Sequence, residues 1–277
     1  MFKEEIKMIV TNLSFYIAIL VTALICLSGT IYIDLDTGEE FNVFQIMFKG
    51  SKSVNVDPVI MNDSKAVLEG TASYLNMFAP MIVAIPFVIL VCGEKKNSLS
   101  KFELLRVNKN RYTLGKLFAV LIAGGCIMVS GYGLYVLVSN CVLPAAEQDM
   151  SMEFQMMTLN RISTAAYHSL GINGLYLIKF VCMFLYGSVS TMLAFAISSF
   201  LKNRYLVLCI PFIMHYFFSM IQESITKVSI PGLSDISEIY RFDDEKSRKI
   251  VILIVTEIVL SAVLYRIVLD RKCDCSE

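Results

Sequence analysis

Six long apolar runs set the pattern of hydrophobic and polar positions along the chain, and charged residues gather between these runs. Each run extends over about 20 residues, enough for a helix to cross the ~30 Å hydrocarbon core of a bilayer. The runs are continuous and lack the in-and-out alternation of membrane β-strands, which excludes a β-barrel. The pattern therefore predicts an all-α, polytopic membrane protein with transmembrane helices at about 13–33, 73–92, 117–140, 175–200, 205–222 and 250–268.

Composition favours the same class and a single transmembrane domain over residues 1–277. Only 17% of the residues are charged and 56% are hydrophobic, whereas soluble domains carry about 25% charged residues. The first run follows Lys3 and Lys7 as a signal peptide would, but it exceeds the ~7–15 apolar residues of such a segment, and no A-x-A-like cleavage site follows it. We therefore expect this run to remain as a membrane anchor.

The distribution of charge predicts how the spans are oriented. An even number of spans places both termini on one side, together with the loop 93–116 and the turn 201–204. That side carries fourteen Lys and Arg and seven Asp and Glu, a net charge of +7, while the loops 34–72, 141–174 and 223–249 lie on a side with a net charge of −6. Because basic loops stay in the cytoplasm, we expect cytoplasmic termini and three extracellular loops, in the cell membrane of a bacterium.

A short amphipathic helix is expected inside the basic loop 93–116. A Ser-x-x-Glu capping box begins at Ser100, and Leu99, Phe102 and Leu105 recur at every third position. An isolated helix of two turns is marginal in water, so its apolar stripe must dock either on the span ends or on another protein.

The basic loop belongs to a series of loose motifs that follow one another in a particular order. They are a second span with two prolines, a Gly-Glu pair, a Leu-Leu pair in the loop helix, and Arg-Tyr and Gly-Lys pairs before the third span: Pro80, Pro86, Gly93-Glu94, Leu104-Leu105, Arg111-Tyr112 and Gly115-Lys116. A tight turn between spans four and five, followed by a proline, completes the series in SSFLKNRYLVLCIPF, residues 198–212. This order, with six spans and both termini inside, resembles the permease subunits of ABC-2 type transporters over the whole chain.

The resemblance implies a transport function that depends on a partner. In that family the first cytoplasmic loop holds a coupling helix that sits in a cleft of an ATP-binding subunit, and two permease halves enclose the transport path. A second copy of the chain or a related permease, surrounded by membrane lipids, would complete the exporter. The residues expected to contact the ABC ATP-binding subunit are Leu99, Phe102, Leu105 and Arg106. The alternative for this loop is a helix that lies on the membrane without a protein partner.

Motifs for chemistry on the chain itself are missing from the sequence. No G-x-x-x-x-G-K-[ST] motif occurs, so ATP is expected on the partner and this chain is expected to hold no cofactor. The two histidines, His168 in an outer loop and His215 in span five, belong to no H-E-x-x-H motif. We expect no enzymatic activity, metal site or nucleic-acid partner, with a membrane-embedded enzyme acting on lipid or peptide as the alternative. In the tail, Cys273 and Cys275 are open to metal binding or acylation.

One acidic residue, Glu257, lies inside an apolar run. It sits about seven residues from the outer end of span six, about 10 Å deep at 1.5 Å per residue. A charged carboxylate there must be paired, protonated or turned toward a wet cavity. With Thr256 and Ser261 it would form a partly polar stripe that either lines the transport path or bonds to another helix. Lys179 and Arg266 lie near predicted span ends and are expected to extend toward the membrane surface.

Surface helices are expected in two places outside the spans. At the N-terminus, one helical face carries Phe2, Ile6, Ile9 and Leu13. This pattern predicts either a helix along the inner membrane surface or the start of span one. In EEFNVFQIMFKG, an interfacial helix is predicted by a face that carries Phe41, Phe44 and Phe48. The segment 222–248 resembles the re-entrant gate of ABC-2 permeases.

Small residues and prolines predict how the spans pack. Span three contains small residues that permit close helix contact, within the chain or in a homodimer: Ala119, Ala123, Gly124, Gly131 and Gly133. Prolines that free backbone carbonyls and are expected to kink spans two and five are Pro80, Pro86 and Pro211.

Overall fold

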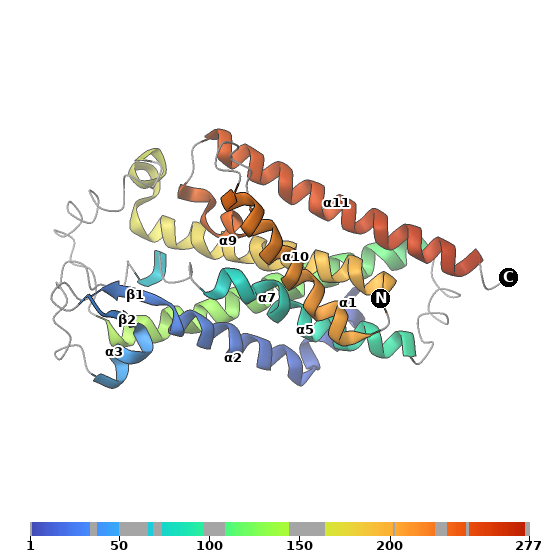
Figure 1. Ribbon diagram of the computed structural model, residues 1–277, viewed down its shortest axis with the longest axis horizontal. Helices are drawn as coiled ribbons and strands as arrows, with labels where there is room; N and C mark the ends of the chain where they lie inside the picture. Colours follow the sequence, from blue (N-terminus) through green and yellow to red (C-terminus); the bar gives the residue numbers. More distant parts are fainter. Residues whose placement is uncertain are drawn as a thin grey trace.

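The computed structural model describes residues 2–33, 38–49, 66–68, 74–96, 109–143, 164–201, 203–224, 232–241 and 244–274. Nearly all of these residues are helical, and the long helices form one elongated bundle (Figure 1). In chain order the elements are α1 (Phe2–Thr11), α2 (Leu13–Ser28), β1 (Thr30–Ile33), β2 (Glu40–Asn42), α3 (Val43–Lys49), α5 (Tyr74–Lys96), α7 (Lys109–Val142), α9 (Thr164–Phe200), α10 (Arg204–Ser224), the 3-10 helix η3 (Ser234–Arg241) and α11 (Asp244–Asp274).

Both chain termini lie toward one end of this bundle, and the β1–β2 hairpin lies at the other (Figure 1). We call these the termini end and the hairpin end.

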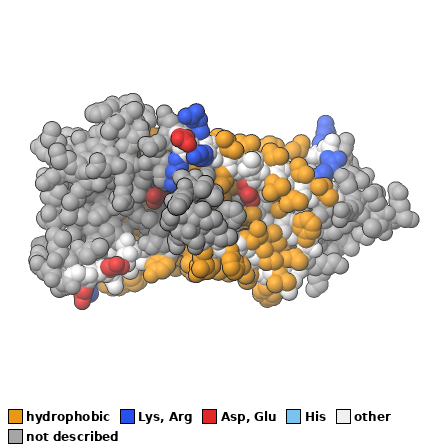
Figure 2. All heavy atoms as spheres, turned by 45° about the horizontal axis from the view of Figure 1, so that its top comes forward, with side chains coloured by type: hydrophobic (Ala, Val, Ile, Leu, Met, Phe, Trp, Pro, Cys, Tyr) orange, Lys and Arg blue, Asp and Glu red, His pale blue; other side chains and the backbone are white. Residues whose placement is uncertain are grey.

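Four helices are long and apolar enough to cross a membrane, through the segments Tyr74–Val91, Asn110–Val142, Gly174–Phe200 and Glu245–Ile267. The count rises to five if α1 and α2 together form one bent span. A broad apolar surface occupies the middle of the face in Figure 2, with Lys and Arg side chains on either side of it. The described residues therefore form a mostly helical membrane protein.

Each of the six predicted spans overlaps a helix, but the count of six spans is not confirmed. α2 has only 16 residues, and the apolar stretch of α10 is confined to Arg204–Phe217. α7 and α9 extend further than predicted, because they begin at Lys109 and Thr164 instead of about 117 and 175. His168, expected in an outer loop, consequently lies in α9.

The N-terminal segment is a helix of its own, separated from α2 by a sharp bend. α1 and α2 meet at an angle of 64°. The bend falls at Asn12, whose side-chain oxygen accepts a hydrogen bond from the Ser14 N–H at 3.1 Å and caps α2. Leu13, predicted on one helical face with Ile9, instead lies beyond the bend as the first residue of α2.

A small antiparallel sheet departs from the predicted all-α fold. α2 ends at Ser28 instead of about residue 33, and β1 then pairs with β2. The β-branched residues of the TIYI segment suit a strand, and Gly38 in the connection adopts a positive φ of 69° that favours glycine. Phe41 lies buried in β2 and not on the predicted helix face with Phe44, which belongs to α3.

Close contact between α7 and α9 organises the core. A Cβ atom added to Gly124 would lie 2.7 Å from the Gly187 carbonyl oxygen, and one added to Gly187 would lie 2.5 Å from the Gly124 carbonyl oxygen. Further along α7, Gly131 meets the Thr22 side chain of α2 in the same way. The small residues of span three are predicted to pack either within the chain or in a homodimer. Gly124 and Gly131 pack within the chain.

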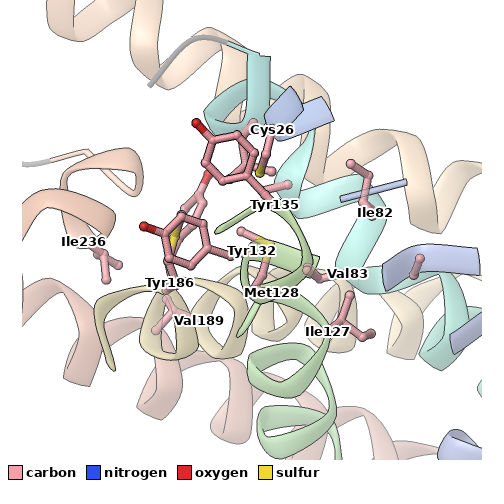
Figure 3. Close-up of a cluster of buried hydrophobic side chains, with 14 of the residues drawn as sticks. Cys26, Ile82, Val83, Ile127, Met128, Tyr132, Tyr135, Tyr186, Val189 and Ile236 are labelled. Atoms are coloured by element: carbon pink, nitrogen blue, oxygen red, sulfur yellow. The ribbon is translucent and has the colours of Figure 1, made fainter. Parts of the chain in front are cut away.

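Three buried tyrosines of this core, shown in Figure 3, donate hydrogen bonds to backbone carbonyls of other segments. Tyr132 donates to the Val67 carbonyl at 2.5 Å and Tyr135 to the Ala66 carbonyl at 2.9 Å, which fixes residues 66–68 against α7. Because these carbonyls are buried, the bonds spare them the cost of lost hydration. Tyr186 of α9 donates in the same way to the start of α5.

The contact of Tyr186 depends on a proline of α5. Asn76 would normally accept from the N–H four residues later, but that residue is Pro80, which has none. Tyr186 Oη donates to the freed Asn76 carbonyl at 2.9 Å, and His215 of α10 also forms a hydrogen bond with the Asn76 backbone. α5 continues through Pro80 and Pro86 as one helix.

Substituting Gly124 by alanine should destabilise the bundle, because the new methyl group would overlap the α9 backbone. Overpacking of this kind costs about 1–3 kcal/mol, so we expect a clearly lower melting temperature in detergent. Gly133→Ala is the matched control, since the nearest atom to its added Cβ lies at an ordinary 3.7 Å. Equal melting temperatures for the two variants would contradict the packing described here.

Candidate functional site

The residues predicted to contact an ATP-binding subunit lie outside the described residues. Leu99, Phe102, Leu105 and Arg106 all fall within 97–108, between the end of α5 and the start of α7. The structure does describe the two helix ends that this segment joins. Both belong to the termini end of the bundle (Figure 1).

The first turns of α7 hold two other helices at this end. Asn110 Oδ1 accepts a hydrogen bond from Arg266 Nη1 of α11. Lys116 Nζ lies 3.7 Å from Glu5 Oε1 of α1. We call these four residues the α7 junction. Asn110 belongs to the first turn of α7 and carries one of its contacts.

The Glu5–Lys116 pair is buried in spite of its charge. Only 9% of the Glu5 side chain and 3% of the Lys116 side chain are exposed. The Lys116 ammonium also lies 5.0 Å from the centre of the Tyr112 ring, a cation–π contact with a fully buried aromatic residue. Removing one member of such a pair leaves an uncompensated charge, so the pair ties α1 to α7.

Local sequence explains why α1 turns this face inward. Glu5 and Ile9 are one helical turn apart, and both are buried. Their neighbours Lys3, Glu4 and Lys7 are exposed. α1 contacts α5 as well as α7, so it packs against both helices that flank residues 97–108.

The Arg266 side of the junction extends into an aromatic contact. Tyr265 stacks on Phe195 of α9, with ring centroids 4.1 Å apart and an interplanar angle of 19°. Phe195 in turn contacts Phe87 of α5 at 5.6 Å. Arg266 therefore bonds to a neighbouring helix instead of only extending to the membrane surface, and the termini half of α11 is held by α7 and α9.

Glu257 lies on the packed face of α11. Ile254 and Ser261, one turn to either side, are 9% and 2% exposed, whereas Val259 on the other face is 55% exposed. Ser261 thus shares the predicted polar stripe with Glu257. Thr256 does not, because it is exposed and its hydroxyl donates to carbonyls of its own helix.

No hydrogen-bond or ion-pair partner of the Glu257 carboxylate is found among the residues that the structure describes. The side chain is half-buried at a contact of α11 with the core. Arg266 follows nine residues later, about 13 Å along the helix at 1.5 Å per residue. Glu257 and the α7 junction are thus separate features of one helix.

Sequence reasoning missed a buried lysine at the hairpin end. Lys179 is fully buried, and its Nζ donates to the Ser237 carbonyl of η3 at 3.2 Å. The prediction that it extends to the membrane surface is wrong, because α9 begins well before the predicted boundary. The contact fixes η3, which lies inside the segment predicted to resemble a gate, against α9.

A metal site receives no support from the described residues, which contain no group of three His, Cys, Asp or Glu that could hold an ion. His215 instead bonds to the α5 backbone. The side chains of His168, Cys273 and Cys275 lie outside the described part of the chain.

The fold is that of a helical membrane protein. Two of its helices, α1 and α11, contact the first turns of α7. Comparison with models of known protein families, with curated proteins and with solved structures finds no match for this chain.

Breaking the buried pair should be costly, and removing both charges should be less so. Glu5→Ala removes the acidic partner of the buried Lys116 ammonium, a loss of about 3–5 kcal/mol in comparable pairs. We expect a much lower melting temperature for Glu5→Ala and partial recovery in the double variant Glu5→Leu, Lys116→Met. Glu4→Ala is the control because Glu4 is exposed. Equal melting of the Glu4 and Glu5 variants would refute the pairing.

Proposed function

We propose that this chain is the membrane-spanning permease subunit of an ABC-2 type exporter, with ATP bound and hydrolysed by separate subunits. The observation that carries the proposal is the α7 junction. The segment 97–108 leads directly into the turns of α7 that hold α1 through Glu5 and α11 through Arg266. A partner that moved this segment would therefore act on three helices at once.

The order of elements supports the same proposal. α1 is a separate helix at the termini end, α10 begins only four residues after the end of α9, and η3 precedes the last helix. These are the places where the resemblance implies an interface helix, a tight cytoplasmic turn and a gate. With the net charge of +7 assigned to that side, the termini end is the cytoplasmic one.

In the proposed mechanism the partner subunits close on ATP and push the segment 97–108 toward the membrane. Packed helices transmit such a displacement because close-packed interfaces shift between discrete arrangements and do not deform smoothly. α11 would move with α7 through the Asn110–Arg266 bond. Glu257 would then change its exposure to the transport path, which two permease halves enclose.

The proposed substrate is an amphipathic peptide or a small molecule. The predicted outer loops, 34–72, 141–174 and 223–249, are too short to add a sizeable domain for receiving a surface polymer. The half-buried carboxylate of Glu257 on a packed helix face would give such a path a single polar position.

The coupling role of the loop is tested by Phe102→Asp. Placing a charge on the apolar stripe should abolish stimulation of the partner's ATPase by the permease while the chain still inserts in the membrane. The assay is ATP hydrolysis by the co-purified complex in liposomes, with Lys101→Gln as a control in the same loop but off the stripe.

Normal coupling in Phe102→Asp would sink the assignment. Absence of any stoichiometric Walker-motif subunit would do the same. Activity of the isolated chain on lipid or peptide, lost on changing Glu257 or His215, would establish the membrane-embedded enzyme in its place.

The junction is tested by Asn110→Ala, which removes the acceptor of the Arg266 hydrogen bond. We expect the complex to assemble and hydrolyse ATP, but to transport several-fold less per ATP because α11 no longer follows α7. Asn140→Ala is the matched control, since Asn140 is an exposed residue at the opposite end of the same helix. Identical transport per ATP in both variants would remove the junction from the mechanism.

A further inference from the structure

An apolar patch lies on α3 at the hairpin end of the bundle. Phe44, Met47 and Phe48 are 45%, 56% and 73% exposed, whereas Val43 and Ile46 of the same helix are fully buried. The Phe44 and Phe48 rings contact each other edge-on, with centroids 4.8 Å apart. We call the three exposed residues the α3 patch. Such a patch needs an apolar partner, because exposing three large side chains to water is unfavourable.

The orientation of the patch is fixed by the start of α3. Asn42 Oδ1 accepts a hydrogen bond from the Gln45 N–H at 2.7 Å, and Gln45 Oε1 accepts one from the Asn42 N–H at 3.2 Å. This reciprocal pair is a capping box with Asn and Gln in place of Ser and Glu. Asn42 Nδ2 also donates to the Ser28 carbonyl at the end of α2 at 3.4 Å, so α3 is tied to that helix.

α2 presents an exposed apolar stripe that stops short of a full span. Leu13, Ile17, Leu20 and Leu24 are between 46% and 72% exposed. At 16 residues, however, α2 covers only about 24 Å at 1.5 Å per residue, less than the ~30 Å hydrocarbon core. α3 follows beyond the hairpin end of α2, along the same edge of the bundle (Figure 1). The α3 patch thus continues the exposed apolar stripe of α2 toward the hairpin end, over the part of the hydrocarbon core that α2 is too short to cover.

The residues around the patch suit the boundary between hydrocarbon and headgroups. Glu39 and Glu40 are exposed next to it, and the Lys49 ammonium lies 4.9 Å from the centre of the Phe41 ring. Aromatic rings beside charged groups are typical of segments that lie in the membrane interface, with the rings turned toward the acyl chains.

We propose that α3 binds the lipid bilayer at the hairpin end, with the α3 patch inserted among the acyl chains just below the headgroups. The inference rests on the membrane-spanning fold and is independent of the transport function. Because Ile46 packs on the same core as α7, the bilayer surface would hold the hairpin and the end of α7 at one depth.

Tryptophan fluorescence can locate the patch, because the chain contains no tryptophan and one introduced residue is the sole reporter. Phe48→Trp is reconstituted into phosphatidylcholine vesicles that carry bromine either near the headgroup end or near the methyl end of the acyl chains. We expect bromine near the headgroup end (the shallow bromine) to quench most of the fluorescence of Phe48→Trp. Bromine near the methyl end (the deep bromine) and the water-soluble quencher acrylamide should quench little of it. Met47→Trp reports the same surface if Phe48→Trp folds poorly.

Two further variants calibrate the depth. Leu20→Trp, in the middle of the α2 stripe, should be quenched by the deep bromine, and Glu39→Trp, on the exposed hairpin, by acrylamide. Quenching of Phe48→Trp by acrylamide would overturn the proposal and place the patch in water. Resistance to all three quenchers would also overturn it, because a protein surface would then cover the patch.

Discussion

The contact of α7 with α9 is the constraint on which the rest of the structure depends. Because Gly124 and Gly187 let the two backbones touch, α9 lies deep among α5, α7, α10 and α11, and its short polar side chains reach the next helix directly. Ser188 Oγ donates to the Leu121 carbonyl at 2.8 Å, so even the hydrogen bonds of this interface require the glycine spacing. In a bilayer, where the hydrophobic effect does not hold helices together, such packing and bonding must do so.

The two ends of the bundle are held by different sets of interactions, and the hairpin end combines bonds to backbone carbonyls with one ion pair, Lys246 to Asp235 at 3.4 Å. At the hairpin end, Tyr132, Tyr135 and Lys179 donate to backbone carbonyls of connecting segments. A backbone carbonyl remains available as an acceptor whichever side chain its residue carries. These bonds therefore fix the connecting segments to the helices. At the termini end the bonds join side chain to side chain, as in Glu5 with Lys116. Such pairs can exchange partners when a helix moves, which suits the end where motion is proposed.

The sequence predicted well which segments are helical, because a helix is almost the only way to satisfy a backbone in hydrocarbon. It could not show which charged residues are buried. Glu5 lies on a short helix whose inward face depends on Lys116, far along the chain. Lys179 was misplaced because the start of α9 was set too late, which put it near a span end. Phe41 was assigned to a helix because the hairpin has no strong turn motif. Glu257 was recognised from its apolar surroundings alone.

Pro80 affects how α9 and α10 are attached to α5, and not only the regularity of α5 itself. By leaving the Asn76 carbonyl without a donor from its own helix, it creates a docking point that two other helices share, through Tyr186 and His215. Any residue with an N–H at position 80 would repair the α5 ladder and compete with Tyr186 and His215 for that carbonyl, which has only two lone pairs. A substitution that restores the regular hydrogen bonding of α5 would therefore weaken the contacts of α5 with α9 and α10.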